Sequence, residues 1–249
     1  ITTDVPGLDE LLGGGIPRGH TVSVFGGPGA GKTTFAVQFL FNGATLHDEP
    51  GLYISLDEPP ICIKRYLSQF GWNLDDVERR NKLAFLDVSP FEHFSGIVKI
   101  GNGAGGESMD WERRFSVSSL NNAIKTAVNK IGAKRIVIDP LSTLLFHYPD
   151  PEARRTAIMD LIRTLRGEID CTSLLVLDLR TAALEREYQL EEYLTQGTIL
   201  FQTMMQPETG LIRVMLIEKM RGVDHDTQPH PYRITKNGIQ VLSKLKCIQ

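Results

Sequence analysis

The feature that most constrains this fold is an apolar strand that runs into a glycine-rich turn and then into a helix. Residues 21–25 are apolar or β-branched apart from Ser23, and residues 33–46 carry apolar side chains at helical spacing. Between them, residues 26–33 match the pattern G-x-x-x-x-G-K-[ST] at every position. This combination predicts a phosphate-binding loop, or P-loop, within an α/β domain.

The residue types in this loop suit a nucleoside triphosphate with magnesium. Glycines let backbone N–H groups approach phosphate oxygens, and the free N–H groups at the helix start favour an anion. Lys32 adds a positive charge at the β- and γ-phosphates, and the Thr33 hydroxyl is a ligand for Mg²⁺. The alternative is a turn that binds nothing, which the complete match argues against. The expected phosphate contacts are Gly26, Gly27, Pro28, Gly29, Ala30, Gly31, Lys32, Thr33 and Thr34.

Strand and helix patterns alternate along most of the chain. We expect strands at residues 21–25, 51–56, 83–86, 135–139 and 173–177, and helices at 33–46, 61–70, 117–131 and 151–169. Strands that are apolar on both faces predict a doubly wound, mainly parallel sheet flanked by helices. Short strands at 198–203, 211–218, 232–235 and 239–242, joined by turn sequences, predict an antiparallel C-terminal extension.

We expect a single domain over residues 1–249, with the polar, Gly-rich segment 89–116 as a mobile excursion from the sheet. The alternative for that segment is a loop without a role.

Composition excludes several other classes. The net charge is −3, so no overall positive field draws the chain to nucleic acid or to a membrane, and no apolar run is long enough to span one. Cys62, Cys171 and Cys247 are widely spaced, which favours reduced thiols in a cytoplasmic protein over a disulfide framework or a zinc site.

Carboxylates follow two of the expected strands. Asp139 ends an apolar strand, where a buried acidic residue needs a partner, and beside a P-loop that partner is the hydration shell of Mg²⁺. Asp57 and Glu58 end another strand and can polarise an attacking water. The alternatives are a capping role for Asp139 and a solvated strand end for the Asp57–Glu58 pair.

Taken together, these features resemble the KaiC family of RecA-like ATPases. The P-loop alone would not select this family, whereas its combination with Phe-Gly-Trp and Lys-x-Arg-Gly is far more specific. The similarity covers nearly the whole chain: residues 7–19, 26–33, 38–43, 49–51, 56–59, 70–72, 138–139, 191–193, 218–222 and 231–239.

The resemblance implies a homohexameric ring with ATP bound between subunits. Lys32, Thr33 and Asp139 would then act from one subunit, while Lys219 and Arg221 would reach the γ-phosphate held by its neighbour. These two side chains alternate with Met220 and so face the same way on a strand, although two solvated basic residues are the alternative. The resemblance also assigns catalysis to Asp57 and Glu58. It assigns contacts with the base and sugar to Gln69, Met220, His225 and Thr235.

The chain departs from the family in four respects. It has one domain where the two-domain members have two, and Asp57 replaces a Glu, which makes Glu58 the better candidate for catalysis. Glu192 and Tyr193 stand where two-domain members carry a phosphorylated Ser-Thr pair, so we expect no self-phosphorylation there. Residues 176–178 lack the usual Thr-Thr-Glu.

Three functions remain open at this point. The first is a slow, oligomerisation-dependent ATPase with a regulatory or signalling role. The second is a RecA-like motor or recombination ATPase acting on DNA. It would need basic or aromatic loops, whereas residues 180–192 are slightly acidic and residues 89–116 carry only Lys99, Arg113 and Arg114 as basic residues. The third is an ATP-responsive scaffold for a protein partner. We expect neither nucleic acid nor membrane as a partner.

Overall fold

The computed structural model describes residues 1–88, 116–179, 188–206 and 210–245. Their strands form one nine-stranded sheet in the order β3-β2-β4-β5-β1-β6-β7-β8-β9. The strands are β1 (Thr21–Gly26), β2 (Gly51–Ser55), β3 (Leu83–Asp87), β4 (Arg135–Asp139), β5 (Thr172–Asp178), β6 (Gly197–Gln206), β7 (Gly210–Met220), β8 (His230–Thr235) and β9 (Gly238–Val241).

The first six strands in that order, from β3 to β6, are parallel to their neighbours. Strand β1 lies between β5 and β6, with Gly26 level with Asp178 and with Phe201. Ser55 at the end of β2 is likewise level with Asp139 at the end of β4. The carboxyl ends of these strands therefore bring several polar residues to one edge of the sheet.

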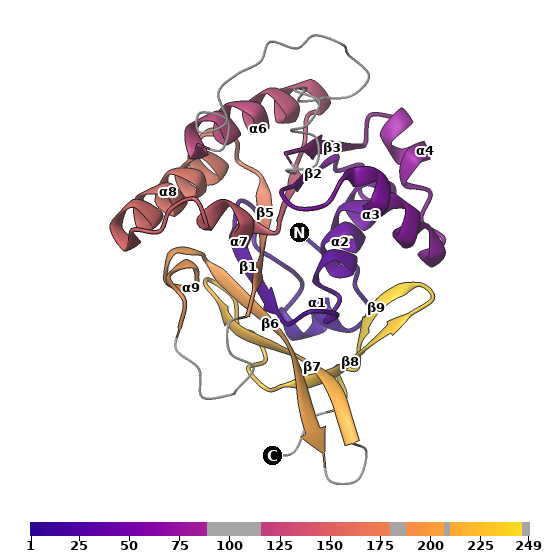
Figure 1. The fold of residues 1–249 in the computed structure, drawn as a ribbon. Helices are drawn as coiled ribbons and strands as arrows, with labels where there is room; N and C mark the ends of the chain where they lie inside the picture. Colours follow the sequence, from indigo (N-terminus) through magenta and orange to yellow (C-terminus); the bar gives the residue numbers. More distant parts are fainter. Residues whose placement is uncertain (89–115, 180–187, 207–209, 246–249) are drawn as a thin grey trace.

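Strands β7, β8 and β9 complete the sheet in antiparallel fashion. The pairing of β6 with β7 is long and contains a register shift between Thr198 and Ile199. Strand β8 pairs with β7 only at Pro231 and His230, then turns away to pair with β9. In Figure 1 the β6–β7 hairpin projects beyond the body of the domain, while β8 and β9 curl back toward α2.

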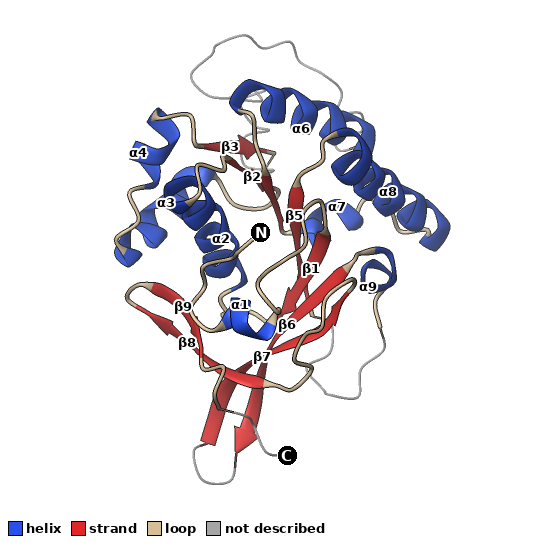
Figure 2. Cartoon of the chain, turned by 180° about the vertical axis from the view of Figure 1, so that it is seen from behind, coloured by secondary structure: helices blue, strands red, loops and turns tan. Residues whose placement is uncertain are grey.

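Helices cover both faces of the sheet, as Figures 1 and 2 show from opposite sides. On one face lie α1 (Leu8–Leu11), α2 (Lys32–Leu46), α3 (Pro60–Leu67) and α4 (Leu74–Arg79). On the other lie α6 (Val117–Ile131), α7 (Leu141–Leu145) and α8 (Pro151–Arg163), with α9 (Leu190–Leu194) at its border. A 3₁₀ turn at Ser68–Phe70 follows α3, and a π-helical turn at Thr164–Glu168 follows α8.

Each face has its own apolar core, because successive strand residues point to opposite sides. Val137 packs on the side of α2, whereas Ile136 and Ile138 pack on the side of α6. The same alternation places Val22 and Val24 against α2 and Phe25 on the opposite face. Two-sided burial explains why these strands read as continuous apolar runs in the sequence.

The expected fold class is confirmed. All nine expected strands and the four expected helices are present, with boundaries that differ by at most three residues, except that α8 ends six residues before the expected residue 169, where the π-helical turn continues to Glu168. Four short helices (α1, α4, α7 and α9) were not expected, because four to six residues are too few to display helical periodicity. The proposed excursion at residues 89–116 lies, apart from Ser116, outside the described residues.

Within the described part of the chain, no helix combines the length and the apolar character that a membrane span requires.

Candidate functional site

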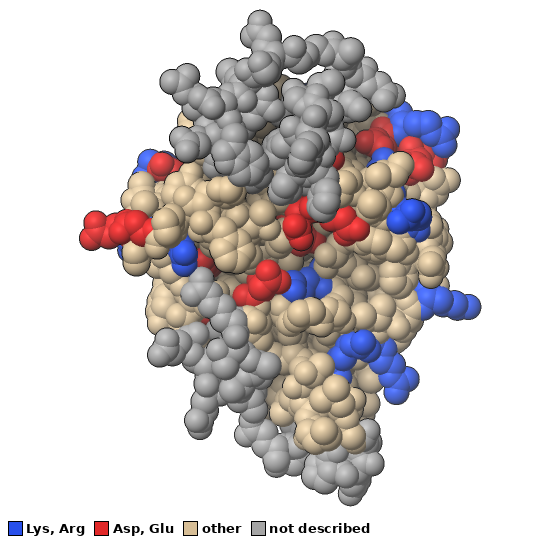
Figure 3. Space-filling view, viewed as in Figure 1, with Lys and Arg blue, Asp and Glu red and all other residues tan. Residues whose placement is uncertain are grey.

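The candidate site lies where the parallel strands end. The P-loop follows β1, Asp139 ends β4, Asp178 ends β5, and Asp57 and Glu58 follow β2. In an open α/β sheet, ligands bind at the carboxyl ends of the strands, where loops diverge to either side. Figure 3 shows acidic side chains gathered near the centre of this face, beside a basic group.

The P-loop backbone is shaped to admit a bulky anion. Gly29 and Gly31 adopt positive φ values of 71° and 90°, and a Cβ at Gly27 or Gly29 would meet nothing within 4 Å. Gly31 begins α2 without a side-chain cap, and the first turn of α2 contains no acidic residue. The helix therefore presents uncapped N–H groups and its positive end to the loop, as phosphate binding requires.

Lys32 is folded back over this loop. Its Nζ donates to the carbonyl oxygen of Gly26 at 2.6 Å and to that of Gly27 at 3.3 Å. It also contacts Asp178 Oδ1 at 3.2 Å, and the Asp178 side chain is 61% exposed. Because the carboxylate is exposed and the contact is long, a phosphate oxygen can replace Asp178 at the ammonium group without loss of a buried ion pair.

Thr33 and Asp139 meet directly beside Lys32. The Thr33 hydroxyl donates to Asp139 Oδ2 at 2.8 Å, and the Tyr53 hydroxyl donates to the same oxygen at 2.6 Å. Burial raises the pKa of Asp139, while the hydrogen bonds from Tyr53 and Thr33 and the charge of Lys32 partly oppose that rise. A buried carboxylate with this environment is stabilised by a nearby cation, so the pair fits the expected magnesium position.

A cavity of about 190 Å³ connects these groups to Glu58. Its wall includes Lys32, Thr33, Asp139, Asp57 and Glu58. It also includes Tyr53, Ser55, Ile63, Tyr66, Pro140 and Asp178. The structure thus brings together the expected phosphate-binding, metal-binding and carboxylate residues in one place.

The described residues contain no group of three or more His, Cys, Asp or Glu side chains that could hold a metal ion alone. Magnesium at Thr33 and Asp139 would therefore depend on phosphate oxygens and water for most of its ligands, which is its usual mode with nucleotides.

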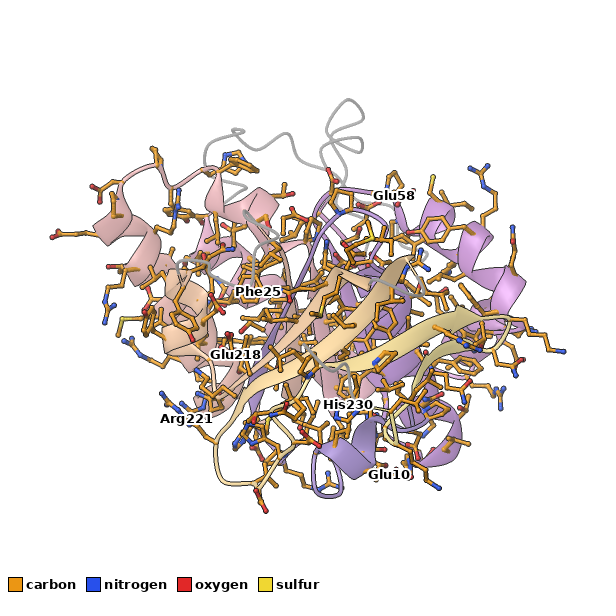
Figure 4. The ribbon with its side chains drawn as sticks, turned by 90° about the horizontal axis from the view of Figure 1, so that it is seen from below. Glu10, Phe25, Glu58, Glu218, Arg221 and His230 are labelled. Atoms are coloured by element: carbon orange, nitrogen blue, oxygen red, sulfur yellow. The ribbon has the colours of Figure 1, made fainter. Side chains whose placement is uncertain are left out.

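Lys219 and Arg221 are not part of the described wall of this cavity. Lys219 Nζ donates to the carbonyl oxygens of Glu192 and Thr195, the second at 2.7 Å, and burial followed by the charge of Arg221 lowers its pKa. Arg221 is exposed. Figure 4 labels Glu58 and Arg221 on opposite sides of the molecule, so one chain does not bring them together.

The four residues expected at the base and sugar are scattered. Gln69 is exposed in the turn after α3, and Thr235 stabilises the β8–β9 turn by donating to the Gly238 carbonyl at 2.9 Å. His225 is half-buried, with Nδ1 3.2 Å from the Val223 carbonyl oxygen. Met220 is 2% exposed and packs against Gly197 in the core, so its side chain is not available to a ligand in this conformation. Their assigned contacts stay predictions.

Sequence reasoning missed the three wall residues whose side chains contact the side chain of an expected site residue. Asp178 ends an apolar strand just as Asp139 does, so the same argument could have found it. Tyr53 is two residues before Ser55 and therefore on its face of β2, but the alternation does not reveal which neighbour it meets. Tyr66 belongs to no sequence motif. The direction of its side chain depends on the residue at which α3 begins, which the sequence does not define closely enough.

Of the two loops considered for nucleic acid, residues 180–187 and most of 89–116 lie outside the described residues.

The fold and the site define a P-loop nucleotide-binding domain of the RecA type. A family model described as "ATPase: KaiC" matches residues 1–246. The chain therefore belongs to the KaiC ATPase family.

Two relatives and one solved structure illustrate this similarity. A UPF0273 protein of Thermotoga maritima is 36% identical over 97% of this chain and 95% of its own length. A UPF0273 protein of Methanocaldococcus jannaschii is 34% identical with the same coverage. The crystal structure of a KaiC-like protein from Pyrococcus horikoshii superposes with a TM-score of 0.78 at 31% identity, with 97% of each chain covered.

Proposed function

We propose that this protein binds Mg-ATP at the P-loop and hydrolyses it slowly at the interfaces of a ring of identical subunits. The observation that carries the proposal is the Thr33–Asp139 contact of 2.8 Å beside Lys32, at the uncapped start of α2. A hydroxyl, a buried carboxylate and a lysine in this arrangement match the parts that hold Mg²⁺ and the terminal phosphates in P-loop ATPases.

The chemistry is the attack of water on the γ-phosphorus. A bond forms between the water oxygen and this phosphorus, and the bond to the β–γ bridging oxygen breaks, so that ADP leaves with the bonding electron pair. Glu58 takes the proton of the water, because its carboxylate lies in the same cavity as Lys32 and Asp139. Mg²⁺, when bound at Thr33 and Asp139, supplies neutralisation of the charge that develops on the phosphate oxygens.

The proposal includes a contribution from a second subunit. The described part of the cavity wall contains one cationic group, Lys32. Phosphoryl transfer benefits from further positive charge on the equatorial oxygens. Arg221 is exposed and distant from Glu58 of its own chain, which suits a cation that serves the neighbouring site. Lys219 lies near the end of β7, two residues before Arg221, and its ammonium group donates to carbonyl oxygens, so its role requires release from Glu192 and Thr195.

We further propose a regulatory or signalling role in the cytoplasm, in which the nucleotide state of the ring controls an unidentified protein partner. Hydrolysis would then act as a timer rather than as a source of mechanical work. A gel shift with single-stranded DNA tests the competing assignment as a DNA motor, and salt-sensitive binding would favour that alternative.

The decisive experiment measures phosphate release by the purified protein with Mg-ATP. Lys32→Ala and Arg221→Ala are each expected to reduce release by at least about 100-fold. Arg79→Ala is the control, because Arg79 is an exposed arginine on α4 that pairs only weakly with Asp76. Release that is unchanged in both Lys32→Ala and Arg221→Ala would refute the proposal.

A further inference from the structure

Tyr66 belongs to no motif, yet it contacts the residue to which we assign proton transfer. Its hydroxyl donates to Glu58 Oε2 at 3.0 Å. Tyr66 is on α3, which begins two residues after Glu58, so only Pro59 separates Glu58 from the helix that carries Tyr66. Both residues line the cavity that contains Lys32, Thr33 and Asp139.

Glu58 is held at two points. The Ser55 hydroxyl donates to its backbone carbonyl, and Tyr66 holds one oxygen of its carboxylate. Asp57 differs, since its side chain is exposed and no described residue forms a hydrogen bond with its carboxylate. The structure therefore distinguishes two adjacent carboxylates that the sequence presents as a pair.

The chemistry of water attack gives this contact a purpose. A carboxylate that accepts a proton from water must keep one oxygen free and directed at the water. A donor on the second oxygen limits rotation of the carboxylate and so defines where the free oxygen points. Burial and the charge of Glu58 raise the pKa of the Tyr66 phenol, so Tyr66 is a protonated donor at neutral pH.

We propose that Tyr66 is a positioning residue of the ATPase, which orients the Glu58 carboxylate toward the attacking water. The inference rests on the proposed function, because it assigns Tyr66 a task only if Glu58 takes the proton. It also explains how Glu58 serves this chain although its neighbour, Asp57, is shorter than the Glu of the family. Tyr66 itself contacts neither nucleotide nor metal in this scheme.

The test is Tyr66→Phe in the full chain, which removes the hydroxyl and retains the ring. We expect kcat for ATP hydrolysis to fall about 10-fold, with KM and the affinity for a fluorescent ATP analogue unchanged within about twofold. Tyr148→Phe is the matched control. It removes a hydroxyl that accepts one hydrogen bond, from the Val117 amide at 3.0 Å, away from the cavity, and kcat should stay within about twofold of wild type.

A double-mutant cycle separates positioning from a structural effect. In a Glu58→Gln background, Tyr66→Phe should lower the remaining rate no further, because the group that it positions is absent. An unchanged kcat in Tyr66→Phe, an equal loss in the Glu58→Gln background, or a loss that appears mainly in KM would each overturn the inference. If wild type hydrolyses ATP and Glu58→Gln does so far more slowly, any of these results leaves the proposed function intact. If wild type releases no phosphate, the proposed function itself fails.

Discussion

At the scale of single residues, Asp139 combines a requirement of the site with a cost to the fold. It is 6% exposed, and two hydroxyls donate to the same oxygen. Burial nevertheless raises its pKa, which means that its ionised form is less stable in the folded protein than in water. A chain selected only for stability would place an uncharged residue here, so the carboxylate indicates a cation that binds during function.

Asp139→Asn separates these two effects. Without nucleotide, the variant should unfold at the same temperature as wild type or higher, because no charge is buried. With Mg-ATP at 100 times Kd, the free energy of unfolding of wild type should rise by about 2.7 kcal/mol, and that of Asp139→Asn should rise far less. Thermal unfolding with and without Mg-ATP measures both. Asp75→Asn, on the exposed first turn of α4, is the control and should retain the full gain. A full Mg-ATP shift in Asp139→Asn would contradict the magnesium assignment.

The lowered pKa of Glu49 implies that the stability of the fold depends on pH. Burial acts to raise its pKa, but the hydrogen bonds and charges of Arg135 and Arg18 outweigh burial and hold the pKa below its ordinary value of 4.5. Its contribution to stability is therefore complete above pH 4.5 and is lost as the pH falls through the lowered value.

Urea unfolding from neutral pH down to about pH 3 should show this loss. Glu49→Gln should unfold more easily at neutral pH and lose less stability on acidification, because Arg135 then has no anionic partner at any pH. Arg18→Ala should keep most of the acid dependence, since Arg18 is exposed and Arg135 remains. Equal acid slopes in wild type and Glu49→Gln would count against this assignment.

At the scale of elements, helix α2 and strand β4 meet around one buried arginine. Arg135 is fully buried and donates to the Glu49 carboxylate and to the Phe39 carbonyl oxygen. Its Cζ lies 4.7 Å from the Phe39 ring centroid. A Cβ on Gly43 would lie 2.2 Å from Arg135 Nε. Because these bonds hold the guanidinium in place, it cannot move to make room.

Gly43→Ala should therefore lower the free energy of unfolding by about 2–3 kcal/mol, although alanine is the better helix former. Gly167→Ala is the matched control, because its helical glycine would place a Cβ in open space, and it should be neutral or stabilise by up to about 1 kcal/mol. Urea unfolding of both variants measures the difference. Equal stabilities would show that the arginine shifts more freely than its hydrogen bonds imply.

The C-terminal strands β8 and β9 pack against the P-loop. The Tyr232 hydroxyl donates to the Ala30 carbonyl at 2.6 Å, and Ile234 and Ile239 approach Gly31. Gln38 of α2 exchanges two hydrogen bonds with the Ile239 backbone, which fixes β9 against the same helix. The antiparallel extension is thus part of the phosphate site rather than an appendage.

Tyr232→Phe should weaken ATP binding roughly 3- to 5-fold, because the P-loop loses a hydrogen bond that holds its shape. This change in Kd corresponds to about 1 kcal/mol of binding free energy. Calorimetric titration with Mg-ATP gives the Kd directly, and Tyr148→Phe again serves as the control. An unchanged Kd in Tyr232→Phe would mean that the P-loop holds its shape without this bond.

At the scale of the whole molecule, the central prediction is a site shared between subunits. The chain should form a six-fold species when Mg-ATP is added, which mass measurement in solution detects. Lys32→Ala and Arg221→Ala should each be inactive alone but should complement one another when mixed and reassembled. At equal amounts and random assembly, about a quarter of the interfaces combine an intact Lys32 with an intact Arg221.

Recovery of about a quarter of the wild-type rate would therefore support a shared site. Wild-type protein mixed with each variant separately gives the dilution controls. A mixture of the two variants that stays inactive, despite evidence of subunit exchange, would mean that both residues act from the same subunit, and it would contradict the shared site.

The sequence by itself determined the fold class and the position of the P-loop. Two-sided apolar strands, helical spacing and the pattern from Gly26 to Thr33 are local properties, and each is readable because its physical cause lies within a few residues along the chain. The strand-end argument placed Asp139 beside the P-loop, where it contacts Thr33, and its magnesium role stays a prediction. The trans roles of Lys219 and Arg221 came from family resemblance and remain predictions.

Only the tertiary structure decided which side chains meet. Tyr66 with Glu58, Tyr53 with Asp139, Asp178 with Lys32 and Tyr232 with Ala30 are contacts between separate elements. Strand order and helix rotation set these contacts, and neither leaves a periodic trace in the sequence. The register of β7 also turns the Met220 side chain into the core, while the ligand contact that the family resemblance assigns to Met220 stays a prediction. A one-residue change in strand register reverses which side chains are buried, so such roles depend on the assembled sheet.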